Sequence, residues 1–294
     1  MMPPSARALE GKVAIITGAS RGLGLEIARR FVSAGSSVVV CARDEDALDA
    51  ARTSLAGDAD AAQNVLAVAA DISVADDVQR LVDAALSLGR IDILVNSAGV
   101  YGPMGSLESV DWKAWTRALE INVYGSVMMC RAVLPAMKAA RHGKIIQLSG
   151  GGATAPMPNI SAYAVSKAAI VRFAETLAEE VRAFGIDVNA IAPGALNTRM
   201  LDEVLEAGPG RVGRDFYDRA VKQKASGGAG LEAGADLALF LATSASDGVS
   251  GKLISALWDD WARWPEHRDE LRSSDAYTLR RITGRERGLT WGDK

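Results

Sequence analysis

The chain has 294 residues, 49% of them apolar and 23% charged, with a formal net charge of −3 at pH 7. This length allows one large α/β domain or two small ones, and the slightly acidic balance lacks the basic excess that nucleic-acid binding needs, so we expect no nucleic-acid partner. Residues 1–10 lack an apolar signal core, and no later segment has the apolar length of a membrane helix, so we also expect no membrane partner.

The cysteines and histidines favour no special chemistry. Cys41 ends an expected strand and Cys130 lies in an expected helix, so we expect two buried thiols, not a disulfide, in a reducing cytoplasm. His142 and His267 have no cysteine or second histidine at ligand spacing. The sequence therefore predicts no metal site.

Short apolar runs alternate with helix-length segments, without a long polar linker. This alternation predicts a single doubly wound parallel-sheet (Rossmann-like) α/β domain with helices on both faces, in which ligands bind beyond the carboxyl ends of the strands. The expected strands are Val13–Thr17, Ser37–Ala42, Val65–Ala70, Ile91–Asn96, Lys144–Leu148, Asp187–Ile191 and Lys252–Ala256.

A glycine-rich turn follows the first expected strand. Gly18, Gly22 and Gly24 come directly after it, and an amphipathic helix follows. Such glycines allow a tight turn, close approach of the backbone to a pyrophosphate, and packing of the helix on the sheet, with the phosphates at the helix N-terminus. We therefore predict a dinucleotide site; the alternative is a turn with a purely structural role.

The spacing of these glycines resembles that of the classical short-chain dehydrogenases/reductases. Other motifs follow in that family's order, and together they cover roughly residues 10–257: Asp71, Asn96-Ser-Ala-Gly99, Asn122, Tyr163-x-x-x-Lys167 and Pro193-Gly194. The resemblance implies an oxidoreductase that interconverts a secondary alcohol and a ketone or aldehyde. It also implies cofactor contacts at Gly18, Ser20, Arg21, Gly22, Leu23, Gly24, Arg43, Asp71, Ile72, Asn96, Ala98, Gly99, Tyr163, Lys167, Pro193, Gly194 and Thr198.

The end of the second expected strand bears on the choice of cofactor. A carboxylate there favours NAD(H), whereas arginine favours NADP(H). The residue that aligns with the family's acidic position is Ala42, Arg43 follows it, and Arg21 adds a second guanidinium. We expect NADP(H), with NAD(H) as the alternative, and Asp44 either pairs with Arg43 or caps the next helix.

After the third and fourth expected strands, the resemblance implies further cofactor contacts. Asp71 would bind the adenine amine and Ile72 would lie against the ring; alternatively, Asp71 is only the N-cap of a helix that starts near Val74. The motif Asn96-Ser-Ala-Gly99 would bracket the central strand and shield the cofactor.

Tyr163 and Lys167 carry the expected chemistry. Four residues apart on a helix, they share one face. A phenol with a pKa of about 10 releases its proton reluctantly, and a neighbouring ammonium would lower that pKa. The resemblance makes Tyr163 the acid in reduction and the base in oxidation, and makes Asn122 the residue whose backbone anchors water to the lysine; alternatively, Asn122 is a polar helix residue near a kink.

The chain departs from the family at the serine that polarises the substrate. That position, thirteen residues before Tyr163, is Gly150, and Ser149 precedes it in a run of three glycines. Glycine freedom could let Ser149 reach the site as a catalytic residue. The alternatives are that a glycine N–H replaces the hydroxyl, or that Ser149 only ends the strand.

Two regions lie outside the motifs. Residues 199–230 correspond to a substrate-covering helical lid in the family, or else to an ordinary flexible connection. Residues 258–294, a C-terminal extension, hold four of the six tryptophans, with eight acidic and eight basic side chains. This composition suits either an interface between subunits or a segment wrapped on its own domain.

The related enzymes pair through long helices, here around residues 115–140 and 161–184, so we expect a homodimer or a homotetramer. A small carbonyl or alcohol is the expected substrate. Two other functions stay open: a nucleotide-sugar epimerase or dehydratase, against which the glycine spacing argues, and a non-catalytic nucleotide sensor, against which the retained Tyr163 and Lys167 argue.

Overall fold

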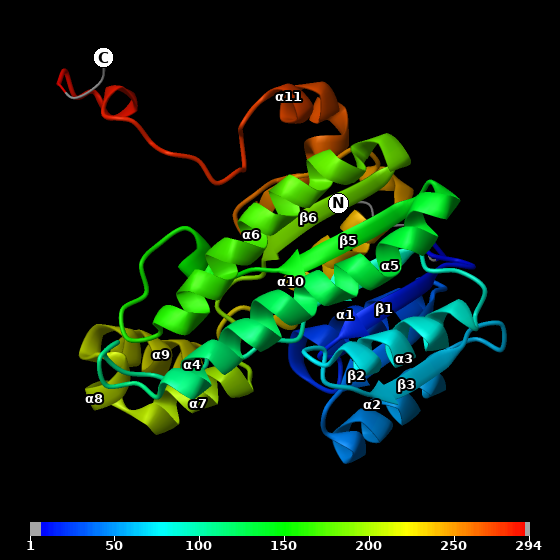
Figure 1. Ribbon diagram of the computed structural model, residues 1–294, viewed down its shortest axis with the longest axis horizontal. Helices are drawn as coiled ribbons and strands as arrows, with labels where there is room; N and C mark the ends of the chain where they lie inside the picture. Colours follow the sequence, from blue (N-terminus) through cyan, green and yellow to red (C-terminus); the bar gives the residue numbers. More distant parts are fainter. Residues whose placement is uncertain (1–6, 292–294) are drawn as a thin grey trace.

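The computed structural model describes residues 7–291, which contain one sheet of seven parallel strands in the order β3-β2-β1-β4-β5-β6-β7 (Figure 1). Each expected strand is present, with ends that differ by at most two residues. The strands are β1 Val13–Thr17, β2 Ser37–Ala42, β3 Val65–Ala69, β4 Ile93–Asn96, β5 Gly143–Leu148, β6 Ile186–Ala192 and β7 Leu253–Ser255.

Helices cover both faces of the sheet, which confirms the predicted doubly wound, Rossmann-like class. Helices α1 (Gly22–Ser33), α2 (Glu45–Gly57) and α10 (Leu231–Ala242) pack on one face. Helices α3 (Ala75–Leu86), α5 (Ser126–Ala140) and α6 (Ser161–Val181) pack on the other. Helix α4 (Trp112–Leu119) continues into α5 through a π-helical turn, Glu120–Gly125.

The central strand β1 explains this layering. All five of its residues are buried. Ala14 and Ile16 point into the apolar cluster beneath α1 and α10, whereas Val13 and Ile15 point into the cluster beneath α3 and α5. A continuous apolar run is what a parallel strand needs when both of its faces are covered.

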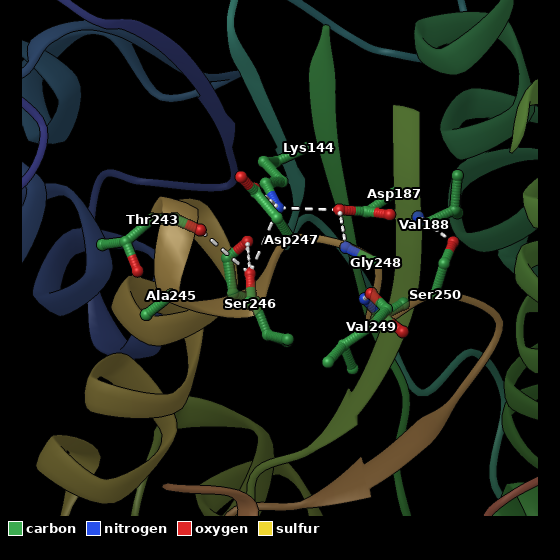
Figure 2. A network of polar contacts seen from close by, with 12 residues as sticks. Lys144, Asp187, Val188, Thr243, Ala245, Ser246, Asp247, Gly248, Val249 and Ser250 are labelled. Carbon is green, nitrogen blue, oxygen red and sulfur yellow. Dashed lines mark hydrogen bonds and ion pairs between the residues drawn. The ribbon is translucent and has the colours of Figure 1, made fainter. Parts of the chain in front are cut away.

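A charged network holds the sheet at the amino ends of β5 and β6 (Figure 2). The Lys144 side chain is only 2% exposed, and its Nζ lies 2.7 Å from both Asp187 Oδ2 and Asp247 Oδ1. The backbone N–H of Gly248 also donates to Asp187 Oδ2. Since a buried ammonium needs such partners, this network ties the connection between α10 and β7 to the sheet, at the edge opposite the expected cofactor site.

The expected lid folds into three helices beside the carboxyl ends of the strands (Figure 1). These are α7 (Arg199–Ala207), α8 (Pro209–Val212) and α9 (Arg214–Ser226). Leu201, Val204 and Val212 are buried in a small apolar cluster, against which Tyr101 and Met104 pack from the loop after β4. The region therefore has its own small apolar cluster.

The C-terminal extension packs on its own domain. Trp261 and Trp264 are buried in the core beneath α10. Farther along, the backbone N–H of Leu253, in the edge strand β7, donates to the carbonyl of Tyr277 at 2.8 Å. Lys252 Nζ donates to two carbonyls of the same segment. After α11 (Arg268–Ser273) and the segment that bonds Lys252 and Leu253, the last part of the chain, red in Figure 1, runs away from the sheet.

Both cysteines of the chain are free and buried. Burial raises the pKa of the Cys41 and Cys130 thiols to about 12, so neither is a reactive thiolate. Within residues 7–291, no helix combines the length and apolar character needed to cross a bilayer.

The extension offers a matched pair of tryptophans for a stability test. Trp264 is 5% exposed and Trp258 is 86% exposed. We expect Trp264→Ala to lower the free energy of unfolding by about 3–5 kcal/mol, since it leaves a cavity in the core. We expect Trp258→Ala to change it by less than about 0.5 kcal/mol. Urea unfolding measures both; equal losses would mean that the extension does not pack on the core.

Candidate active site

The order of strands reverses between β1 and β4, and the glycine-rich turn lies at this point. Gly18 has a φ of 66°, and a Cβ there would lie 2.7 Å from the Ala98 Cα. A Cβ at Gly24 would lie 2.5 Å from the carbonyl oxygen of Gly18. Both positions therefore require glycine, and they bring the turn and the Asn96–Gly99 motif into contact.

Helix α1 begins directly behind this turn with an open N-terminus. Gly22 is its first residue, Arg21 makes no side-chain capping bond, and no acidic residue lies in the first turn. A Cβ at Gly22 would lie 3.6 Å from Thr198 Cγ2, which places Thr198 beside the turn. Free N–H groups and a glycine surface without side chains fit the pyrophosphate of a dinucleotide.

Other expected cofactor residues surround the turn. A Cβ at Gly234, in α10, would lie 3.1 Å from both Leu23 and Pro193, so these two side chains meet there. Gly194 follows Pro193 with a φ of 97°. Ser20 lies half-buried in the turn itself.

Asp44 connects the glycine turn to α2. Its carboxylate accepts the Ala47 N–H as the N-cap of α2 and also pairs with Arg21 Nη2 at 2.9 Å. Of the two expected alternatives, the cap is confirmed. The predicted pairing of Asp44 with Arg43 is wrong, since Asp44 pairs with Arg21. The exposed Arg43 lies near the carboxylate of Asp71 instead.

Asp71 lies in the loop after β3. Its carboxylate accepts the N–H and hydroxyl of Ser73 and pairs with Arg117, from α4, at 2.5 Å. Burial opposes its ionisation, but these partners hold the pKa of Asp71 below its usual value. The N-cap alternative is wrong, because Val74 is the N-cap of α3. Ile72 is buried, against Gly125.

Two asparagines bind the loop after β4 to the helices. The buried Asn96 donates to the Ser126 carbonyl of α5 at 3.3 Å. Asn122 lies in the π-helical turn, where its side-chain amide bonds both the N–H and the carbonyl of Val100 and donates to Ser166 Oγ. The π turn is thus the helix irregularity that the sequence suggested, and Asn122 joins α6 to this loop.

Tyr163 and Lys167 lie on α6, at the carboxyl end of β5. Lys167 Nζ donates to the Leu148 carbonyl at 2.7 Å and lies 5.5 Å from the centre of the Tyr163 ring. A Cβ at Gly99 would lie 3.6 Å from Lys167 Nζ, so the lysine also adjoins the Asn96–Gly99 motif. The two α6 residues therefore share one face and meet the loop after β4, as their spacing predicts.

The pKa values differ from the sequence-based expectation. Burial lowers the pKa of the Lys167 ammonium to about 8. Burial, together with the nearby Tyr101, raises the pKa of the Tyr163 hydroxyl instead of lowering it. The physical reason is that Lys167 bonds a carbonyl and not the phenol, while the apolar surroundings disfavour a phenolate. At neutral pH, the Tyr163 hydroxyl is therefore protonated and can donate a hydrogen bond.

Ser149 and Gly150 lie next to this pair. Ser149 is buried, and its Oγ has no hydrogen-bond partner among residues 7–291. A Cβ at Gly150 would overlap the hydroxyl oxygen of Tyr163. Because Gly150 has no side chain, the Tyr163 hydroxyl can occupy this space.

Three residues that contact the predicted site were not identified from the sequence. Thr17 Oγ1 accepts the N–H groups of Ser97 and Ala98, which fixes the ends of β1 and β4 together. Arg117 binds Asp71, and the Tyr101 ring lies 4.7 Å from that of Tyr163, centre to centre. Thr17 ends the first apolar run, a signal that was available, whereas Arg117 and Tyr101 depend on contacts between distant segments.

Comparisons with known proteins agree with this geometry. The family model for short chain dehydrogenases matches residues 12–208. Dehydrogenase/reductase SDR family member 4 from Sus scrofa is 36% identical over 191 residues, which are 65% of this chain and 67% of that protein.

Two similar solved structures contain different cofactors. A gluconate 5-dehydrogenase from Burkholderia cenocepacia J2315, in complex with NADP and tartrate, has a TM-score of 0.73 and 29% identity and covers 85% of this chain and 95% of its own. A 3-ketoacyl-(acyl-carrier-protein) reductase from Brucella melitensis, complexed with NADH, also has a TM-score of 0.73, with 32% identity over 84% of this chain and 97% of its own.

Gly150 and Gly151 form a matched pair for a test of the Tyr163 position. A Cβ at Gly150 would overlap the Tyr163 hydroxyl, whereas a Cβ at Gly151 would meet nothing within 4 Å. We expect Gly150→Ala to lower kcat about 10²-fold, because a displacement of about 1 Å at a reacting group has that effect. Gly151→Ala should stay within about twofold. Steady-state kinetics measures both, and an unaffected Gly150→Ala would contradict the position of Tyr163.

Proposed function

The chain belongs to the short-chain dehydrogenase/reductase family, and from this premise we propose that it is an NADP(H)-dependent oxidoreductase that interconverts a secondary alcohol and a ketone or aldehyde. One observation carries the proposal. Tyr163, protonated at neutral pH, lies on α6 with Lys167, beside the loop that follows β4 and near the glycine turn of β1.

The chain's own residues would hold the cofactor as follows. The N–H groups at the start of α1 and the glycine surface at Gly18 and Gly22 receive the pyrophosphate. Asp71 and Ile72 would bind the adenine, and the Asn96–Gly99 motif would hold the nicotinamide side. When bound, a reduced nicotinamide supplies a hydride to the substrate carbon.

The proton chemistry belongs to three residues. Tyr163 gives its proton to the carbonyl oxygen during reduction and takes it back during oxidation. Lys167 holds the nicotinamide ribose and supplies positive charge. Asn122 anchors the loop after β4 to α6 through its side-chain amide and, through its backbone, water near the lysine. Ser149 would join them only if its buried hydroxyl turned toward Tyr163.

Arg21 and Arg43 support the preference for NADP(H). Ala42 carries no charge that would repel a 2′-phosphate, and the exposed Arg43 guanidinium is available at the end of β2. Arg21 would exchange Asp44 for the phosphate, at the small cost of an exposed ion pair. NAD(H) is the alternative.

Two other functions predict different outcomes. An epimerase or dehydratase would form product without net consumption of NADPH, and a sensor would bind the cofactor without any chemistry. No observation on this chain favours either of them over the reductase.

Three further features bear on the substrate, the oligomeric state and the location of the protein. Apolar side chains at Met104 and Leu201 support a small carbonyl compound with an apolar flank. The exposed Tyr124 and Val165, in the segments that pair in related enzymes, support a homodimer or homotetramer. The free thiols fit a cytoplasmic location.

Cofactor choice can be measured by calorimetric titration with NADPH and NADH. We expect NADPH to bind more tightly and Arg43→Ala to weaken NADPH binding about tenfold or more, because a charge-assisted hydrogen bond is lost, while NADH binding changes little. Arg52→Ala, which alters an exposed arginine of α2, is the control. Tighter NADH binding would contradict the NADP(H) preference.

The reaction itself can be tested by NADPH consumption with a panel of ketones and aldehydes. We expect turnover by the wild type and a loss of about 10²-fold or more in Tyr163→Phe, which lacks the proton donor. Cofactor binding by this variant, measured by calorimetry, should persist. Binding of the cofactor without turnover of any carbonyl by the wild type would favour the sensor.

A further inference from the structure

The site lacks an obvious second donor for the substrate oxygen. As negative charge develops on a carbonyl oxygen, a second fixed donor beside the proton donor contributes strongly to rate. Gly150 has no side chain, and a Cβ there would overlap the Tyr163 hydroxyl oxygen. The Ser149 hydroxyl is sealed from solvent, with no partner among residues 7–291.

Tyr101 brings another hydroxyl-bearing side chain to the same place. It follows β4, and its ring lies 4.7 Å from the Tyr163 ring, at an interplanar angle of 59°. Neither phenol hydroxyl has a hydrogen-bond partner within the described part of the chain, and neither belongs to the sealed polar atoms that include Ser149 Oγ. Both hydroxyls therefore keep unused hydrogen-bonding capacity for a ligand.

The backbone that carries Tyr101 is rigidly held. Asn122 bonds the N–H of Val100 at 2.9 Å and its carbonyl at 2.8 Å. On the other side, Gly102 has a φ of 74°, and a Cβ there would lie 2.7 Å from the Ala118 Cβ. Since both neighbours of Tyr101 are fixed against α4 and the π turn, its position beside Tyr163 is preorganised.

The surroundings of Tyr101 keep it protonated. Burial, and to a lesser extent Glu203 of α7, raises the pKa of its hydroxyl. A phenol with a raised pKa stays neutral, and remains a hydrogen-bond donor, throughout the neutral and mildly alkaline range.

We propose that Tyr101 is a second catalytic residue, whose hydroxyl donates a hydrogen bond to the same carbonyl oxygen that Tyr163 protonates, in place of a side chain at Gly150. This assignment rests on the proposed reductase function. In the reduction, the C=O π bond breaks, a C–H bond would form with the hydride from the reduced nicotinamide, which is thereby oxidised, and an O–H bond forms as the Tyr163 O–H bond breaks. Tyr163 is left as a phenolate that regains a proton from solvent, and Tyr101 keeps its own proton, so atoms and charges balance.

The position of Tyr101 also narrows the substrate class. Tyr101 packs against the apolar cluster of Leu201, Val204 and Val212, between the lid helices and Tyr163. A substrate whose carbonyl reaches both hydroxyls therefore places its flanking group against this aromatic and aliphatic wall. A carbonyl next to a planar apolar group fits this arrangement best.

The test uses 1-phenyl-1,2-propanedione as the carbonyl probe and NADPH, or NADH if it binds more tightly. We expect Tyr101→Phe, which keeps the ring, to lower kcat about 10²-fold and to change KM by less than about threefold. The pH profile should keep its position, because Tyr163 remains the acid. Tyr277→Phe, a matched change in the C-terminal extension, should stay within about twofold. Urea unfolding checks that each variant is folded.

Ser149→Ala is measured alongside. A loss of kcat in Tyr101→Phe that exceeds the loss in Ser149→Ala supports the assignment. Unchanged turnover in Tyr101→Phe, or a loss confined to Ser149→Ala, overturns it while the reductase function stands. If the wild type consumes neither cofactor with this probe or any carbonyl of the panel, the proposed function and the Tyr101 assignment both fail.

Discussion

The side-chain amide of Asn122 is the interaction on which the geometry of the site depends. It bonds both polar backbone groups of Val100 and the hydroxyl of Ser166, so one residue in a π turn joins the loop after β4 to α6. Tyr101 follows Val100, and Tyr163 and Lys167 lie in the same α6 as Ser166. Loss of this amide would therefore loosen both sides of the site at once, because the two partly buried backbone groups of Val100 would lose their partners.

Burial sets the electrostatics of the site. Lys167 is enclosed, and this burial lowers the pKa of its ammonium to about 8, while its Nζ donates to a backbone carbonyl. The same enclosure raises the pKa of the Tyr163 hydroxyl. A low-dielectric site of this kind keeps the phenol protonated but makes it a weaker acid, so a cationic group that binds nearby and lowers its pKa would have a strong effect on proton release.

The C-terminal extension and helices α7, α8 and α9 cover different edges of the sheet. The edge strand β7 would expose its polar backbone groups, and the C-terminal extension covers part of that edge through the bond from Leu253 to Tyr277, while its buried Trp261 and Trp264 anchor it in the core. At the carboxyl edge, helices α7, α8 and α9 have their own apolar cluster, against which Tyr101 and Met104 pack from the loop after β4. These helices and the site are thus linked by packing.

The sequence by itself determined the sheet, its helices and the positions of the motifs. Apolar runs such as Val13–Thr17 and the glycine spacing are local signals, since strand burial and tight turns constrain neighbouring residues directly. Pairings between distant segments were decided only by the tertiary structure: Asp44 with Arg21, Asp71 with Arg117, and Tyr101 with Tyr163. The direction of the Tyr163 pKa shift likewise depends on enclosure by several elements, which no local pattern of residues encodes.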